Sequence, residues 1–329
     1  MKEIKKSVTM KDVARLAGVG VGTVSRVVNN EKGVKKVTLD KVHKAIKELD
    51  YLPDAYARGM KINKTETVAL IIPTIWHPFF AEFSFYVENE LSKQGYKLLL
   101  CNIDGDKKEI EYITMLKQNK VDGIIAITYS PIEDYLTTNI PFVSIDRTYE
   151  NKHIACVTSD NKAGAQLAAQ KLIEKGCREI AFVGSHNSTN NETKNRHLYF
   201  EQYLTREGYH CHSFDIEEPF DNFVEQLEIF LKEHPQIDGI FAINDFVALD
   251  VIDILEHLGK KVPDDVQVIG YDGIRLANER RYPVSTIKQP LELMAKEAVR
   301  MLLSVIDGES YPLQSVLPIS FKEGPTTKK

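Results

Sequence analysis

Short apolar runs alternate with longer amphipathic stretches between residues 63 and 329, and this alternation restricts the possible folds more than any other feature of the chain. Continuous apolar runs separated by helical stretches are typical of parallel sheets built from strand–helix–strand units. Because the runs fall into two series, before and after about residue 160, the sequence predicts two similar α/β lobes. Strands are expected at 68–72, 97–100, 123–127, 142–145, 180–183, 239–243 and 266–270, with a helix at 79–93.

The first 50 residues have a different pattern, which predicts three short helices. Thr9 and Asp12 have the spacing of a capping box, so a helix is expected to begin after Thr9 and to end at Gly18. A second helix is expected at about 20–28, and a third begins near Thr38. Three short helices with a glycine-containing turn between the first two predict an all-α helix–turn–helix head.

The formal charge of −5 conceals an asymmetry along the chain. Residues 1–62 carry 14 Lys and Arg against 7 Asp and Glu, whereas the remainder carries 28 against 40. The head therefore has a formal charge of +7 and the rest of the chain −12. A small basic segment on an acidic body is typical of nucleic-acid binding, although charge alone does not distinguish it from a solvated surface.

Several other classes of protein are disfavoured by the sequence. The chain has no apolar run of about 18 residues, so we expect no membrane span and no membrane partner. Its charged first residues, 1–6, differ from a signal peptide. The chain also lacks the common hydrolase, zinc-protease and phosphate-loop motifs, so an enzyme is not expected. The four cysteines are widely spaced, at Cys101, Cys156, Cys177 and Cys211. This spacing favours a reducing cytoplasm, and we expect no disulfide, no bound metal and no cofactor.

Four ordered strings carry a family resemblance: TMKDVA at 9–14, AGV at 17–19, TVSRVVN at 23–29 and DYLPDA at 50–55. Together they resemble the lactose-repressor (LacI/GalR) family of bacterial transcriptional regulators. The resemblance implies a two-lobed, periplasmic-binding-protein-like body with parallel sheets behind the head. It implies the following division: a head at 1–50, a hinge helix at 51–62, and a body at 63–329, with lobe one at about 63–160 and 290–320 and lobe two at about 161–289 and 321–329.

In this family the second helix of the head lies in the major groove of DNA, with its N-terminal side chains against base edges. By this resemblance Val21, Gly22 and Arg26 are expected to face bases, and Arg26 is able to donate two hydrogen bonds to guanine. Gly20 and Gly22 depart from the serine and the larger residue usual in the family, so one operator position is expected to be read weakly or through DNA shape. Phosphate contacts are expected from Thr9, Ser25, Asn29 and Thr38.

The hinge helix of the family enters the minor groove, where an apolar side chain from each subunit unstacks the central base step. Met60 occupies this wedge position by register, and Ala57 is small enough to let the backbone approach the DNA. A plain linker is the alternative for this segment. The resemblance implies that the partner is a pseudo-palindromic double-stranded operator bound by a homodimer.

Polar and aromatic residues follow the strands expected in the body, at the edge where open α/β sheets bind ligands. Aromatic walls with a few fixed polar groups suit a hydroxyl-rich ligand such as a sugar or a sugar phosphate. His77 departs from the asparagine usual in the family, which leaves the first-lobe contact open. Each residue alone is also compatible with loop capping or core packing. The expected effector-binding residues are Phe79, Phe80, Asp146, Arg196, Asn244 and Asp272.

These observations predict a sequence-specific DNA-binding transcriptional regulator. We expect it to repress carbohydrate-utilisation genes, with an operator affinity controlled by a small sugar-like effector between the two lobes. Three alternatives remain: a co-repressor such as a purine base, a phosphocarrier protein as the partner of the body, and a transporter's sugar-binding protein. The intact head disfavours the last of these.

Overall fold

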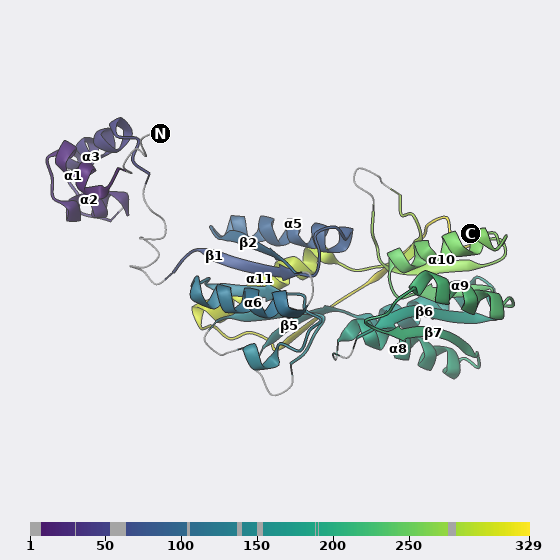
Figure 1. Cartoon of the computed structure of the whole chain (residues 1–329). Helices are drawn as coiled ribbons and strands as arrows, with labels where there is room; N and C mark the ends of the chain where they lie inside the picture. Colours follow the sequence, from purple (N-terminus) through teal and green to yellow (C-terminus); the bar gives the residue numbers. More distant parts are fainter. Residues whose placement is uncertain are drawn as a thin grey trace. The chain divides into compact units, whose positions relative to one another are not determined.

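The computed structural model describes residues 8–29, 31–52, 64–103, 106–136, 140–149, 154–187, 189, 191–275 and 281–329 (Figure 1). The chain forms two compact units, Met1–Thr65 and Glu66–Lys329, which we call the head and the body. Across the described ranges, no helix is long and apolar enough to cross a membrane. The same ranges contain no group of three or more His, Cys, Asp or Glu side chains suited to holding a metal ion.

The head contains the three expected helices, α1 (Met10–Ala17), α2 (Val21–Val28) and α3 (Lys36–Glu48). The carboxylate of Asp12 accepts hydrogen bonds from the backbone N–H (3.0 Å) and the hydroxyl (2.7 Å) of Thr9, which fixes the start of α1. Gly18 ends this helix in the left-handed region at φ 65°, which glycine adopts without steric cost. The buried core of the head consists of Val13, Ala14, Ala17, Val24, Val27, Val42, Ala45 and Tyr51.

The first sheet of the body contains six parallel strands in the order β11-β5-β4-β3-β1-β2. Helices α5 and α11 pack on one face of this sheet and α6 on the other, and we call the whole layer lobe one. Its elements are β1 (Thr67–Ile72), α5 (Pro78–Lys93), β2 (Lys97–Asn102), α6 (Asp106–Gln118), β3 (Gly123–Ala126), η1 (Glu133–Tyr135), β4 (Phe142–Ile145), β5 (Ala155–Ser159), α11 (Leu291–Asp307) and β11 (Gln314–Leu317).

The second sheet has the order β12-β10-β9-β8-β6-β7, parallel except for β12. Side chains alternate between its faces: Phe182 packs with α7 and α8, whereas Val183 packs with α9 and α10. We call this layer lobe two. Its elements are α7 (Asn161–Glu174), β6 (Ile180–His186), α8 (Glu192–Arg206), β7 (Cys211–Glu217), α9 (Phe223–Glu233), β8 (Gly239–Ala242), α10 (Asp245–His257), β9 (Gln267–Asp272), β10 (Ser285–Lys288) and β12 (Ser320–Lys322).

The chain passes between the two sheets three times, after β5, after β10 and after β11 (Figure 1). Two of these crossing segments are joined directly, because the hydroxyl of Ser159 donates to the side-chain carbonyl of Gln289 at 2.7 Å. Both side chains are buried. A buried hydrogen bond therefore connects the two crossing segments between the lobes.

One strand is longer than the sequence predicts. The strand expected at 180–183 runs to His186, because β6 stays paired with β7 from Ile180 opposite Cys211 to His186 opposite Glu217. Ser185 and His186 therefore lie at a strand end instead of in a loop. Arg196 lies within helix α8, on the buried face of the helix.

Candidate ligand cleft and DNA-reading helix

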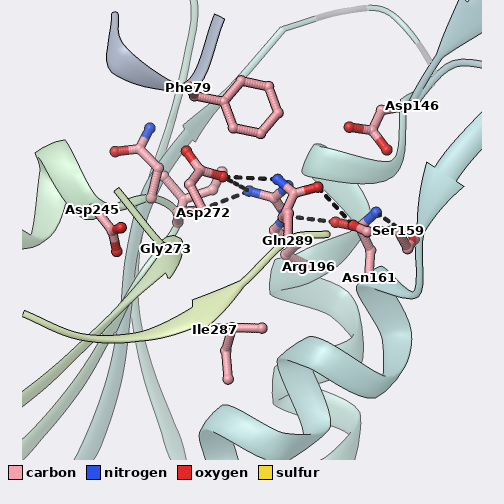
Figure 2. A network of polar contacts seen from close by, with 12 residues as sticks. Phe79, Asp146, Ser159, Asn161, Arg196, Asp245, Asp272, Gly273, Ile287 and Gln289 are labelled. Carbon is pink, nitrogen blue, oxygen red and sulfur yellow. Dashed lines mark hydrogen bonds and ion pairs between the residues drawn. The ribbon is translucent and has the colours of Figure 1, made fainter. Parts of the chain in front are cut away.

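The guanidinium of Arg196 is the centre of a buried polar network at the strand ends of lobe two (Figure 2). Its Nε donates to the side-chain oxygen of Asn161 (2.7 Å), and its Nη1 donates to the backbone carbonyl of Ile243 (2.9 Å). Nη1 also lies 3.8 Å from a carboxylate oxygen of Asp272. The guanidinium lies over the ring of Tyr271, 3.7 Å from its centroid, which adds a cation–π contact.

Asp272 ends strand β9 in an unusual backbone conformation, at φ 110°. Its carboxylate accepts a hydrogen bond from the side-chain amide of Gln289 at 2.9 Å. Burial raises the pKa of Asp272 to about 6, although Arg196 and the Gln289 hydrogen bond both lower it. Gln289 therefore links Asp272 of lobe two to Ser159 on the neighbouring crossing segment.

Asp146 follows strand β4 of lobe one, in the left-handed region at φ 57°. Its carboxylate accepts a hydrogen bond from the Thr158 hydroxyl (2.6 Å), and its backbone carbonyl accepts one from the N–H of Glu192 (2.9 Å). Glu192 is the first residue of α8, so this contact joins lobe one to the helix that carries Arg196. Burial raises the pKa of Asp146, and the Thr158 and Arg196 side chains partly offset that effect.

Phe79 and Phe80, which follow β1, are both buried in the core of lobe one, and Phe79 lies at its edge toward the cleft (Figure 2). Figure 2 shows the ring of Phe79 facing the Arg196–Asp272 network. Phe80 packs within the core of lobe one. His77 performs the capping role that asparagine usually has, because its Nδ1 accepts a hydrogen bond from the Phe79 N–H at 3.3 Å. Burial lowers the pKa of His77 to about 4, so the ring is neutral near pH 7.

A pocket of about 170 Å³ opens beside this network. Asn244 lines it and also begins α10, where its side-chain oxygen accepts a hydrogen bond from the Val247 N–H at 2.8 Å. Tyr129, which follows β3, contributes the lobe-one wall. The other walls come from lobe two: Ser185, His186, Asn187, Asn191, Thr193, Lys194, Glu218 and Ile243.

Sequence reasoning missed Tyr129, His186, Gln289 and Tyr271. Ligands of open α/β sheets bind beyond the carboxyl ends of the strands, and Tyr129 lies three residues beyond the last residue of β3. The reasoning that selected Asp146 and Asp272 therefore covers Tyr129 equally well. Burial raises the pKa of the Tyr129 phenol, and the negative charges of Asp146, Asp272 and Glu218 act in the same direction. Tyr271 directly precedes Asp272 in β9, so the same strand-end reasoning covers it. Gln289 carries no local signal, because its role depends on Ser159 and Asp272, which belong to other elements.

In the head, the residues expected to face DNA lie on or beside α2. Val21 is exposed at the first turn, and a Cβ placed on Gly22 would meet no other atom within 4 Å. Arg26 is engaged within the head: its Nη2 donates to the backbone carbonyl of Lys32 (3.0 Å), and its Nε lies 3.3 Å from a carboxylate oxygen of Glu31. A contact with guanine would have to replace part of this pairing.

Some of the side chains expected to contact phosphates already form hydrogen bonds within the head. The Thr9 hydroxyl donates to Asp12, and the side-chain amide of Asn29 donates to the Ser25 hydroxyl at 3.3 Å. Thr38 lies in the first turn of α3 with a half-buried side chain. Ala57 and Met60 lie outside the described residues.

The head and the body together define a class of protein: a helix–turn–helix DNA-binding unit joined to a two-lobed ligand-binding unit. Residues 9–54 match the sequence profile of the bacterial regulatory proteins of the lacI family, and residues 169–327 match that of the periplasmic binding protein-like domain. The ribose operon repressor of Halalkalibacterium halodurans is 37% identical over 301 residues, which cover 91% of this chain and 90% of that protein. The sucrose operon repressor of Pediococcus pentosaceus is 35% identical, covering 96% of this chain and 98% of that protein.

Solved structures support the same architecture. The lac repressor dimer bound to operator and the anti-inducer ONPF has a TM-score of 0.84 at 24% identity and covers 98% of this chain and 99% of its own, which shows the fold. The CelR–cellobiose complex has a TM-score of 0.71 at 29% identity, with 97% and 99% covered. The chain belongs to the lacI family of bacterial regulatory proteins. It is a DNA-binding transcriptional regulator of a family made up of repressors, not an enzyme.

Proposed function

We propose that this regulator represses carbohydrate-utilisation genes and that a sugar-like small molecule, bound between its lobes, controls its affinity for operator DNA. The observation that carries the proposal is the buried network of Arg196 and Asp272, with Asp146 near it (Figure 2). The pocket lined by Tyr129 and Asn244 opens beside this network. Fixed donors and acceptors beside aromatic rings suit a ligand with several hydroxyl groups. The sugars in the names of the similar repressors, ribose and sucrose, favour the same class of ligand.

The proposed mechanism is thermodynamic linkage between the cleft and the head. A ligand that bridges Asp146 of lobe one and Arg196 of lobe two favours one arrangement of the lobes over others. In a homodimer this arrangement sets the spacing of the two heads on a pseudo-palindromic operator. Reciprocity requires that operator DNA change the affinity for the ligand by the same factor.

On the DNA side, we propose that Val21, Gly22 and Arg26 face base edges and that Thr9, Ser25, Asn29 and Thr38 contact phosphates. The position of the first two at the N-terminal turn of α2 supports this assignment. Ala57 and Met60 are proposed to act in the minor groove. A protein that binds operator DNA in a bacterium acts in the cytoplasm, which is the location we propose.

The test is fluorescence anisotropy of a labelled duplex from the upstream region of the gene, carrying a pseudo-palindrome and titrated with the full chain. D-Ribose, sucrose and hypoxanthine are then added in turn. Release by one sugar supports the proposal. Tighter binding with hypoxanthine would show a co-repressor instead, and binding no tighter than to a scrambled duplex would overturn the assignment of the operator.

Ligand binding can be followed independently, because Trp76 is the single tryptophan of the chain. It lies between β1 and α5, next to His77, and is 91% exposed. A ligand that changes the contacts of His77 is expected to change the emission of Trp76. Arg196→Lys keeps the positive charge but loses the planar donor geometry, so it should abolish the change.

A further inference from the structure

The cleft contains more carboxylates than cations. Besides Asp146 and Asp272, Glu192 begins α8, and burial and the charge of Asp146 both raise the pKa of Glu192. Glu218 lines the pocket directly. A ligand that adds negative charge to the cleft is therefore repelled by these carboxylates.

Arg196 is poorly placed to compensate for a phosphate. A guanidinium binds phosphate best through two parallel N–H groups. In this structure, however, Nε donates to Asn161 and Nη1 donates to Ile243. The face of the guanidinium is covered by the ring of Tyr271. Each parallel pair of N–H groups on Arg196 therefore already contains a nitrogen that donates to a protein acceptor.

Two further basic side chains line the pocket, His186 and Lys194. The Nδ1 atom of His186 lies 3.0 Å from a carboxylate oxygen of Asp215, which offsets any positive charge on that ring. Lys194 is exposed in the first turn of α8, where water competes for its ammonium group. It shares the pocket with the carboxylate of Glu218.

Glu218 is exposed, as Lys194 is, but two hydrogen bonds fix it on the pocket wall. Its backbone N–H donates to the carbonyl of His186 (2.7 Å), and its carboxylate accepts from the Ser185 hydroxyl (2.8 Å). Its negative charge also acts on the phenol of Tyr129, on the lobe-one wall. The carboxylate is thus held on the pocket wall, close enough to the Tyr129 phenol for its charge to act on that group.

We infer that Glu218 is a charge-selecting residue, which makes the cleft accept an uncharged polyhydroxy ligand and reject the phosphate ester of the same ligand. The inference rests on the proposed function and narrows its ligand class. Hydroxyl groups of an uncharged sugar donate to the Glu218 carboxylate and accept from the side-chain amide of Asn187, whereas a phosphate dianion only accepts. Like charges brought together in a site repel each other, and this repulsion discriminates between ligands that differ in charge.

The experiment compares matched pairs of ligands: D-ribose with D-ribose 5-phosphate, and sucrose with sucrose 6-phosphate. Isothermal titration with the full chain gives the ratio of the dissociation constants of ester and parent sugar. For the sugar that binds, the ester is expected to bind on the order of 100-fold more weakly. In Glu218→Gln, which keeps the shape and the acceptor for Ser185, the ratio should fall by about tenfold.

Glu225→Gln is the matched control, because Glu225 is an exposed glutamate on α9 outside the pocket and its replacement changes the net charge equally. This control should leave the ratio unchanged. An ester that binds as tightly as its parent sugar would overturn the inference while leaving a cleft ligand in place. So would a ratio that Glu218→Gln and Glu225→Gln change equally. If none of the four compounds binds while operator DNA does, the sugar ligand of the proposed function fails, and the inference fails with it.

Discussion

The imidazole ring of His77 in lobe one lies 4.6 Å, centroid to centroid, from the ring of Phe246 in lobe two. His77 caps α5 and Phe246 lies in the first turn of α10, directly after Asn244 and Asp245. The contact therefore joins the starts of two helices that flank the candidate cleft. Because burial keeps His77 neutral, the contact is expected to persist unchanged between about pH 6 and pH 8.

Removing this contact should weaken the arrangement of lobes seen here. Phe246→Ala is expected to weaken binding of the cleft ligand about two- to tenfold, since an aromatic pair contributes about 0.5–1.5 kcal/mol. The measurement is the dissociation constant from Trp76 emission. Ile229→Ala, an equally exposed apolar truncation on α9, should leave the constant unchanged. Equal effects of both variants would show that the ring pair has no specific role.

The sequence predicts the layers of the body well, because buried parallel strands are continuous apolar runs such as residues 68–72 and 142–145. It also predicts that Asp146 and Asp272 lie near a site, because both follow strands. It does not predict that Gln289 bonds to both Asp272 and Ser159, since Ser159 ends β5, Asp272 ends β9 and Gln289 follows β10. Such contacts depend on tertiary register, which local patterns do not contain.

The same limit applies to the head. The matched string around Arg26 predicts its place on α2, but not its pairing with Glu31 and Lys32, which follow the helix. Tyr129 lies just beyond the end of β3, where the sequence predicts ligand contacts, but its packing against a pocket made otherwise by lobe two depends on tertiary structure. Residues that act within one element are visible in the sequence, and residues that act between elements are not.

Asp272 should make stability depend on pH in a predictable direction. Its folded pKa of about 6 lies above the ordinary value of 3.8, so between these two values the folded state binds more protons than the unfolded state. Its contribution to the free energy of unfolding therefore falls as pH rises from about 4 to 6. Asp272→Asn has no carboxylate to titrate, so its free energy of unfolding, relative to that of the unaltered protein, should rise by about 2 kcal/mol from pH 4.5 to pH 7.5.

Urea unfolding followed by circular dichroism measures this difference at each pH. Asp264→Asn is a suitable control, because Asp264 is exposed and lies before the start of β9, at the opposite end of the strand from Asp272. A difference between Asp272→Asn and the unaltered protein that is constant with pH would contradict the assignment of the raised pKa to Asp272.

The Arg26–Glu31 pair is expected to compete with DNA. Glu31→Gln frees the guanidinium and should tighten operator binding by up to about fivefold, the range of an exposed ion pair. Glu48→Gln removes the same charge from the exposed surface of α3 and is the control for general repulsion of phosphates. Anisotropy titrations at matched salt measure both. Equal tightening by the two variants would show that Arg26 does not exchange Glu31 for DNA.

Two glycines of the head should respond in opposite ways to the same substitution. Gly22 lies inside α2 with open space around it, so Gly22→Ala is expected to stabilise the helix by about 0.5–1 kcal/mol. Gly18 ends α1 at φ 65°, where a Cβ is strained although no neighbour obstructs it, so Gly18→Ala should destabilise by about 1–2 kcal/mol. Hydrogen exchange of the α1 and α2 amides in the full chain measures both changes. Changes of the same sign would mean that local backbone preference does not control the stability of this head.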